Sequence, residues 1–453
     1  MMMRLSEVAQ ALGVQLRGAD VAFDAVCTDS RTIRRGDLFI ALKGERFDAN
    51  AFVAQAASAG AAAAVVGRAS DAAIPQLVVG DTLDALAKLG RHWRSRFELP
   101  LIALTGSNGK TTVKEMLASI LRAQAGEDGV LATRGNLNNH IGVPLMLLEL
   151  RERHRYAAIE MGMNHPGEIA QLAAIGRPTV ALVNNAQREH MEFMSSIEAV
   201  AQENAAVFAA LPADGTAVVN ADDAQAGYFR AAAGTRRVVD FGIEQAAAVS
   251  GGYVLKDLSS EIKLRTPAGE ASAMLAIPGL HNVRNALAAC ACAHAVGIAP
   301  AVMREGLNNF RPYNGRLQVK RATSGATVID DSYNANPDSV RAAIDVLAKC
   351  PPPTVLVLGD MGEVGDHAEE FHREVGAYAR SRNVSSLCAF GEKTRGAVAA
   401  FGAAASHAQS VEQLLERVKA CATPQATLLV KGSRFMRMER VVQALTGETG
   451  GAH

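Results

Sequence analysis

Residues 100–124 have the sequence PLIALTGSNGKTTVKEMLASILRAQ, and this stretch decides the fold of the chain around it. An apolar run typical of a buried β-strand leads into a glycine loop, and an amphipathic helix follows. Gly106 and Gly109 can adopt positive φ and bring backbone N–H groups to phosphate oxygens, while the positive end of the helix points at the same anion. Lys110 would neutralise the β- and γ-phosphates of a nucleotide, and the Thr111 hydroxyl would bind Mg²⁺. The stretch predicts a phosphate-binding loop.

The loop departs from the general pattern GxxxxGK[ST] at the first glycine, where this chain has Leu104. A GK[ST] triplet is common by chance, and a surface turn before a helix would have the same local sequence. The entering strand, the two glycines and the paired Thr111 and Thr112 favour phosphate binding over that alternative.

Strands and helices alternate along most of the chain, which predicts an α/β fold with mostly parallel sheets and right-handed crossovers. Further buried strands are expected at YAAIEMG, PTVALVNNA, TAVVN, ATVIDD, PTVLVLGD, SSLCAFG and TLLVKGS. Helices are expected to begin near Asp338, His367, Val411 and Arg434.

A cluster of Pro, Tyr, Asn and Gly at residues 311–316 is typical of a linker. With a chain of 453 residues, too long for one ordinary core, it predicts three α/β domains. We expect a small N-terminal domain at residues 1–95, a central P-loop ATPase domain at 96–312, and a Rossmann-like, doubly wound C-terminal domain at 313–453.

The charge balance excludes some classes of partner. The 46 basic and 46 acidic side chains give zero formal net charge, which offers no support for a nucleic-acid partner or an acidic membrane surface. The first residues, MMMRLSEVAQALG, lack the apolar segment and cleavage site of a signal peptide, and no apolar run is long enough to span a bilayer. We expect a cytoplasmic protein without membrane insertion.

Two strand ends offer candidate metal ligands. Glu160 ends the strand YAAIE, where a magnesium-ordering carboxylate would lie in a parallel sheet, although an exposed strand-end acid would have the same sequence. His190 follows the strand PTVALVN, where a metal or phosphate contact and a purely structural role are both open.

Polar residues elsewhere could hold the rest of a nucleotide. Asn282 and Asn285 lie at a helix start, where Asn side chains can recognise adenine, and N-capping by Asn282 is the alternative that the residues alone favour. Arg316, in the expected linker, could place a mobile cation over the γ-phosphate or could be solvated.

A second polar cluster lies in the expected C-terminal domain. In DDSYNANPDS, Asp331 ends a strand and a helix follows Asn336, which is compatible with a ligand site or an ordinary capped turn. In KGSR, the residues Lys431, Ser433 and Arg434 end a strand and open a helix, which suits an anion such as a carboxylate.

Taken together, these residues resemble the Mur ligase family of peptidoglycan synthesis over nearly the whole chain. The resemblance is carried by TDSR, GDLFIALKGERFD, TGSNGKTT, RGNLNNHIGVPL, EMGMNHPGEI, PGLHNVRNALAA, YNGR, DDSYNANPDS, LGDMGEVG and KGSR. TGSNGKTT would fit any member or the related folylpolyglutamate synthases, whereas NLNNHIGVP and DSYNANPDS resemble the branch that adds D-alanyl-D-alanine.

The resemblance implies a monomeric ligase that uses ATP and Mg²⁺ to join D-alanyl-D-alanine to UDP-N-acetylmuramoyl-tripeptide through an acyl-phosphate. Catalysis is expected from Lys110, Glu160, His190 and Arg316, and Mg²⁺ binding from Thr111, Glu160 and His190. ATP is expected to contact Thr105, Gly106, Ser107, Asn108, Gly109, Lys110, Thr111, Thr112, Asn282, Asn285, Arg316 and Asp331. The tripeptide nucleotide and the dipeptide are expected to contact Ser30, Arg31, Asn136, Asn138, Asn139, Asn334, Asn336, Lys431 and Ser433.

One departure from the family concerns the metal site. Members usually have an A-K-G-E stretch whose lysine carries a carbamate and assists a second magnesium, whereas this chain has Asn204 in VAQENAAVF. A neutral amide cannot supply the negative oxygen of a carbamate. Either one metal suffices, or Glu203 takes over, or the alignment slips. We expect an enzyme that works without a lysine carbamate.

Two other functions remain open. Another amide ligase of the family could add a single amino acid or glutamate. A non-catalytic or switch-type nucleotide-binding module is the distant alternative, and the absence of a guanine-recognising NKxD motif disfavours a GTPase switch.

Overall fold

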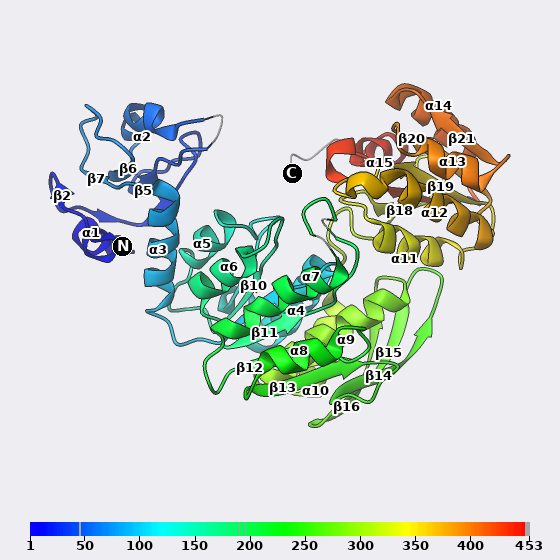
Figure 1. Ribbon diagram of the computed structural model, residues 1–453, viewed down its shortest axis with the longest axis horizontal. Coiled ribbons are helices and arrows are strands. Elements are labelled where there is room, and N and C mark those ends of the chain that lie inside the picture. Colours follow the sequence, from blue (N-terminus) through cyan, green and yellow to red (C-terminus); the bar gives the residue numbers. More distant parts are fainter. Residues whose placement is uncertain (45–46, 190, 195, 449–453) are drawn as a thin grey trace.

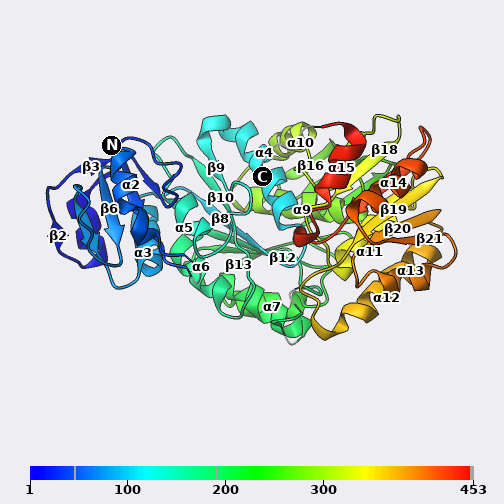
Figure 2. The same cartoon turned by 90° about the horizontal axis from the view of Figure 1, so that it is seen from above.

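The computed structural model describes residues 1–44, 47–189, 191–194 and 196–448. In this part of the chain, sheets of five, nine and six strands follow one another along the sequence, beside a separate two-stranded pair. The N-terminal, central and C-terminal regions that carry these three sheets lie next to one another, with the central region in the middle (Figures 1 and 2). The expected α/β fold is confirmed. No helix within the described ranges is both long and apolar enough to cross a lipid bilayer.

The N-terminal region is a small α/β unit whose sheet has the order β2-β7-β6-β5-β4. Its elements are β1 (Met3–Arg4), α1 (Leu5–Leu12), β2 (Leu16–Arg17), β3 (Ala22–Phe23), β4 (Ala25–Cys27), β5 (Asp37–Ile40), η1 (Ala49–Phe52), α2 (Val53–Ser58), β6 (Ala63–Val66), β7 (Gln76–Val78) and α3 (Thr82–Arg94). Leu38 and Ile40 of β5 pack into one apolar cluster and Phe39 into another. The strand is therefore covered on both faces, as its continuous apolar sequence requires.

The central region is built on the nine-stranded sheet, in the order β16-β15-β14-β13-β12-β11-β8-β10-β9. Its elements are β8 (Leu101–Thr105), α4 (Lys110–Ala125), η2 (Glu127–Gly129), β9 (Val130–Ala132), α5 (Gly142–Leu147), β10 (Tyr156–Glu160), α6 (Glu168–Gly176), β11 (Val180–Val183), α7 (Ile197–Ala205), η3 (Ala206–Ala210), β12 (Thr216–Asn220), α8 (Ala226–Ala233), β13 (Arg237–Gly242), β14 (Val249–Leu255), β15 (Ser260–Thr266), β16 (Gly269–Leu275), α9 (Leu280–Ala295) and α10 (Pro300–Asn309). From the edge strand β9 through β10, β8, β11, β12 and β13 to β14, neighbouring strands pair in parallel. Strands β14, β15 and β16 pair antiparallel and form the other edge.

Strand β8 lies inside this sheet, between β10 and β11. Ile102 and Leu104 pack into an apolar cluster with Val113 of α4, whereas Leu101 and Ala103 pack into the cluster on the other face. Because successive side chains of a strand point to opposite faces, a strand buried on both sides needs this unbroken apolar run. The burial holds the carboxyl end of β8, and with it the glycine loop, in one position.

The C-terminal region has a six-stranded sheet in the order β17-β18-β22-β19-β20-β21, parallel except for β17. Its elements are β17 (Gln318–Arg321), β18 (Thr327–Asp331), α11 (Pro337–Leu347), β19 (Thr354–Gly359), η4 (Gly365–His367), α12 (Ala368–Ser381), β20 (Ser386–Phe390), α13 (Arg395–Phe401), β21 (Ala405–Ala408), α14 (Val411–Cys421), β22 (Thr427–Lys431), η5 (Arg434–Met436) and α15 (Glu439–Thr446).

Three of the four helix starts expected in the C-terminal region are confirmed, at α11, α12 and α14. At the fourth, a short 3₁₀ helix (Arg434–Met436) begins at the expected residue, and the α-helix α15 begins only at Glu439. Arg437 ends that 3₁₀ helix with a left-handed φ of 51°, which interrupts a continuous helix.

Candidate active site

The glycine loop after β8 has the backbone geometry of a phosphate-binding loop. Gly106 has φ 131° and Gly109 has φ 84°, and α4 begins at Lys110 directly after them. A Cβ atom on Gly109 would lie 2.4 Å from Oδ1 of Asn285, and one on Gly106 would lie 3.0 Å from the backbone nitrogen of Asn184. Both positions therefore require glycine for their φ angle and for the close approach of neighbouring groups.

A chain of hydrogen-bonded Asn side chains stabilises this loop. Asn184 Nδ2 donates to the Asn108 carbonyl at 2.8 Å and to Asn285 Oδ1 at 3.1 Å, and Asn285 Nδ2 donates to Asn282 Oδ1 at 3.0 Å. The alternative in which Asn282 caps α9 is wrong, because Gly279 is the N-cap and Asn282 Nδ2 donates to the Pro278 carbonyl at 2.7 Å. Asn282 and Asn285 are buried and line a cavity of about 400 Å³ behind the loop.

Lys110 is fixed at the opening of the loop. Its Nζ donates to the carbonyls of Gly106 and, at 3.2 Å, Ser107, and forms an ion pair of 2.8 Å with Glu189. Both side chains of that pair are nearly buried, at 13% and 12% exposure, so little water screens the charge. The ammonium lies where the positive end of α4 also points, which makes this position favourable for an anion.

Glu160 has a carboxylate oxygen that is available for a cation. The residue is 3% exposed, its Oε1 accepts a hydrogen bond of 2.8 Å from Asn138 Nδ2, and its buried Oε2 has no partner in the described part of the chain. A buried carboxylate oxygen without a partner costs stability, and a hard divalent cation would satisfy it. Thr111 lines the same cavity, of about 530 Å³. The donor set therefore fits Mg²⁺.

The remaining predicted metal ligand, His190, lies outside the described residues. Among those that the structure describes, no group of three or more His, Cys, Asp and Glu side chains is arranged to hold a metal ion. The metal site as a whole therefore stays a prediction.

Asn204 stands at the position of the expected carbamate lysine, and its side chain makes buried hydrogen bonds within the protein. Asn204 is 1% exposed, its Oδ1 accepts from Thr105 Oγ1 at 2.7 Å, and its Nδ2 donates to the Val200 carbonyl at 3.1 Å. The two carboxylate oxygens of Glu203 accept the N–H groups of Gly167 and Ile169 at 2.7 and 2.8 Å, at the start of α6.

The expected substrate residues Asn136, Asn138 and Asn139 lie in the loop between β9 and α5 and line the same cavity as Glu160. Asn138 holds Glu160, whereas the side chain of Asn139 accepts the N–H groups of Ile141 and Gly142 and so stabilises the start of α5.

In the C-terminal region, the predicted ribose and dipeptide residues contact each other. Lys431 Nζ donates to Asp331 Oδ2 at 2.6 Å and to the Asn334 carbonyl at 2.8 Å, and Ser433 Oγ donates to the Ala335 carbonyl at 3.1 Å. Burial lowers the pKa of Lys431, while the Asp331 carboxylate acts in the opposite direction. The pair supports the loop that carries Asn334 and Asn336, which line the same cavity as Glu160.

Arg316 lies where the two cavities meet and lines both of them. Its guanidinium stacks on the Tyr333 ring at 4.2 Å, and its buried Nε has no hydrogen-bond partner in the described ranges. A cation held this way can reach an anion in either cavity without breaking an ion pair.

Ser30 and Arg31 lie apart from the other candidates. They line a cavity of about 610 Å³ formed entirely within residues 28–55 of the N-terminal region. The Arg31 guanidinium, through hydrogen bonds to the neighbouring carboxylate, lowers the pKa of Asp29 to about 2. The structure thus brings the central and C-terminal candidates together and leaves these two at a separate site.

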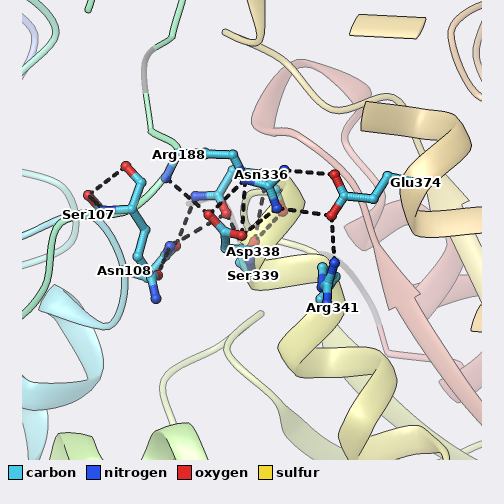
Figure 3. A network of polar contacts seen from close by, with 9 residues as sticks. Ser107, Asn108, Arg188, Asn336, Asp338, Ser339, Arg341 and Glu374 are labelled. Atoms are coloured by element: carbon cyan, nitrogen blue, oxygen red, sulfur yellow. Dashed lines mark hydrogen bonds and ion pairs between the residues drawn. The ribbon is translucent and has the colours of Figure 1, made fainter. Parts of the chain in front are cut away.

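Sequence reasoning named Asn108 and Asn336 but not their contact, and it missed Arg188, which also joins the central and C-terminal regions. Asn336 Nδ2 donates to Asn108 Oδ1 at 2.9 Å, and Arg188 reaches Asp338 and Glu374 across the same interface (Figure 3). Glu189, the partner of Lys110, was also missed. The charged residues Arg188 and Glu189, in the loop that follows the buried strand β11, were the signal that could have found them.

Three family models match the chain: "Mur ligase family, catalytic domain" at residues 22–94, "Mur ligase middle domain" at 104–293, and "Mur ligase, glutamate ligase domain" at 315–434. The UDP-N-acetylmuramoyl-tripeptide–D-alanyl-D-alanine ligase of Escherichia coli K12 is 41% identical over 97% of this chain and 98% of its own length. The enzyme of the same name from Haemophilus influenzae is 38% identical over 98% and 99%.

Solved structures agree with this similarity. A crystal structure of MurF from Acinetobacter baumannii superimposes with a TM-score of 0.92 at 36% identity, covering 99% of this chain and 100% of that one. A MurF ligase from Thermotoga maritima in complex with ADP superimposes with a TM-score of 0.82 at 25% identity, over 93% and 96%.

Proposed function

The chain belongs to the Mur ligase family, and from that premise we propose that it joins D-alanyl-D-alanine to UDP-N-acetylmuramoyl-tripeptide, converting ATP to ADP and phosphate. The observation that carries the proposal is a single cavity lined both by the glycine loop after β8, called the phosphate loop below, and by Asn334 and Asn336 of the C-terminal region. Asn108 of the phosphate loop is hydrogen-bonded to Asn336 at 2.9 Å. Phosphoryl transfer and amide formation need their reactants in such a shared space.

We propose that the three regions divide the substrates as the sequence predicted. Residues 1–95 would bind the UDP end through the cavity at Ser30 and Arg31, and residues 96–312 would bind ATP. Residues 313–453 would bind the dipeptide near Asn334 and Asn336. The cytoplasmic location and the monomeric state remain proposals.

The central region offers a place for each part of ATP. The N–H groups of the glycine loop and Lys110 would hold the β- and γ-phosphates, Arg316 would approach the γ-phosphate, and the cavity at Asn282 and Asn285 would take the nucleoside. Asp331 at its edge would reach the ribose. Thr111, Glu160 and His190 would hold Mg²⁺, which supplies positive charge beside the phosphates when bound.

The chemistry then follows from positioning. A carboxylate is a poor electrophile, so its oxygen attacks the γ-phosphorus of ATP, ADP leaves, and an acyl-phosphate forms. The free amine of D-alanyl-D-alanine attacks the acyl carbon, loses a proton, and expels phosphate from the tetrahedral intermediate. Lys110 would neutralise the transferred phosphoryl group, exchanging its ion pair with Glu189 for the phosphate oxygens.

We also propose that this reaction proceeds without a lysine carbamate. The side chains of Asn204 and Glu203 each make two structural hydrogen bonds, which supports the proposal. Peptide mass spectrometry of active enzyme is expected to find no carboxylated lysine near the metal site, and detection of one would overturn the proposal.

The direct test of function is ADP release with UDP-N-acetylmuramoyl-tripeptide, measured with and without D-alanyl-D-alanine. Release is expected to need both substrates. Equal or greater release with single amino acids or glutamate would identify another Mur-type or folylpolyglutamate-type ligase. Slow hydrolysis that no acceptor stimulates would identify a nucleotide-binding module instead.

A further inference from the structure

Arg188 is the most extensively paired side chain between the central and C-terminal regions shown in Figure 3. It lies in the loop after β11, and its guanidinium binds two carboxylates of the C-terminal region. Nη2 lies 2.5 Å from Asp338 Oδ1 at the start of α11, and Nη1 lies 2.7 Å from Glu374 Oε2 on α12. The backbone N–H of Arg188 donates to Asp338 as well, at 3.0 Å.

The surroundings of Arg188 make these contacts stronger than ordinary surface ion pairs. The guanidinium lies over the Phe371 ring at 5.1 Å, and the side chains of Arg188, Asp338 and Glu374 are only 21%, 25% and 28% exposed. The planar guanidinium of Arg188 makes directional hydrogen bonds to two partly buried carboxylates, so its orientation as well as its charge stabilises the contact. Accordingly, hydrogen bonding to Arg188 is the main cause that lowers the pKa of Glu374.

The loop that carries Arg188 also holds the phosphate loop. Gln187 N–H donates to Ser107 Oγ at 2.9 Å, and Asn108 Nδ2 donates to Gln187 Oε1 at 2.7 Å. The N–H of Asn108 donates to Asn185 Oδ1 at 2.8 Å. One short segment, residues 185–188, therefore touches the phosphate loop at one end and the C-terminal region at the other.

We propose that Arg188 is a positioning residue for the ligation, which holds α11 and the Asn334–Asn336 loop against the phosphate loop while the amine attacks. The inference rests on the proposed function, because it assigns the dipeptide to that loop. Without the Arg188 side chain, this network keeps two contacts across the interface among the described residues, the backbone contact to Asp338 and the Asn108–Asn336 hydrogen bond. The acyl-phosphate and the amine then spend less time at reacting distance, whereas the phosphate loop and its binding of ATP are unchanged.

The test compares Arg188→Gln with Arg341→Gln in the full-length enzyme. Arg341 binds the same Glu374 at 2.7 Å and lies over Tyr378, but all three residues belong to the C-terminal region. The control therefore removes a second ion pair of the same carboxylate and leaves the Arg188 contacts between the two regions in place. The readouts are kcat/KM for D-alanyl-D-alanine in the ADP-release assay, the Kd of a non-hydrolysable ATP analogue, and the radius of gyration by X-ray scattering.

Arg188→Gln is expected to lower kcat/KM for the dipeptide about 10- to 100-fold, to leave the analogue Kd within about threefold, and to raise the radius of gyration. Arg341→Gln should stay within about threefold in all kinetic constants. Arg188→Lys, which keeps the charge but loses the fork, should fall between wild type and Arg188→Gln.

Three results would overturn the inference: an Arg188→Gln enzyme with wild-type kinetics, an equal loss in Arg341→Gln, or a matching loss of analogue binding. Failure of the proposed function is distinguishable, because wild-type enzyme would then show no dipeptide-dependent ADP release. In that case the scattering of Arg188→Gln against Arg341→Gln would still decide whether Arg188 holds the two regions together.

Discussion

The phosphate loop and the Asp331–Lys431 pair are both polar sites at the ends of buried parallel strands, but they are built differently. The loop is contiguous, and its geometry comes from two glycines and the start of α4. Asp331 and Lys431 are 100 positions apart and meet because β18 and β22 pair in parallel with these residues in register. The comparison teaches that a site made by local backbone has the geometry its sequence suggests. Side chains that meet through the sheet can instead be committed to each other.

The strongest test of this contrast is to break the buried pair. Lys431→Met leaves the Asp331 carboxylate, 11% exposed, without its cation, so the free energy of unfolding should fall by about 3–5 kcal/mol. Urea unfolding followed by circular dichroism measures the change. The double variant Lys431→Met/Asp331→Leu should recover much of the loss, because no charge is then left unpaired. A single variant that is as stable as wild type would show that the pair is not structural.

The corresponding change in the phosphate loop should act on activity. Lys110→Met removes the cation that would face the transferred phosphoryl group, and kcat for ADP release should fall about 10²- to 10³-fold. Lys88→Met is the control, because Lys88 forms an exposed ion pair with Asp84 on α3. Retention of more than a tenth of the wild-type kcat by Lys110→Met would contradict the assignment.

Two glycines with similar φ angles test whether the geometry of the phosphate loop depends on close packing as well as on backbone conformation. Gly109 and Gly126 flank α4 with φ angles of 84° and 78°, but only Gly109 has neighbours within 4 Å of an added Cβ. Gly109→Ala should weaken binding of an ATP analogue about tenfold or more, whereas Gly126→Ala should cost only about 1–2 kcal/mol of stability. Calorimetric titration of the analogue decides between them, and equal Kd values would refute the steric argument.

The smallest expected effect is that of pH on the contact between the regions. Arg188 holds the pKa of Glu374 below its ordinary value of 4.5. The carboxylate therefore stabilises the folded, associated state fully above pH 4.5, and this contribution is lost as pH falls through the lowered pKa. The radius of gyration of wild-type protein should rise when pH falls from about 6 to below about 4, and that rise should shrink in Arg188→Gln. Identical pH profiles would mean that Glu374 does not titrate against Arg188.

Much of the fold was predictable because its signals are local. The apolar run before Gly106, the strand ending at Glu160 and the helix after Asn336 are each encoded by a few adjacent residues, and the structure has an element at each place. The antiparallel edge formed by β14, β15 and β16 was not predicted. The middle strand β15 alternates buried and exposed side chains, but its partners β14 and β16 do so only weakly, so the pairing depends on neighbours that the sequence does not reveal.

The sequence predicted which residues belong to the candidate site better than it predicted which partners they contact. Asn282 was expected to read adenine or cap its helix, yet its amide donates to the Pro278 carbonyl and its Oδ1 accepts from Asn285. Arg188 and Glu189 were missed because their partners, Glu374 and Lys110, lie 186 and 79 positions away. A charged residue next to a strand is normally solvated, and only the approach of another region changes that.

The sequence by itself determined the α/β fold, the strand–glycine loop–helix unit and the membership of the polar clusters, because backbone conformation and burial follow from neighbouring residues. Tertiary structure alone decided that Lys431 is paired with Asp331, that Glu203 and Asn204 are engaged in structural hydrogen bonds, and that Arg188 joins two regions. Those facts depend on which distant side chains share a buried space, where an unpaired charge or amide costs most.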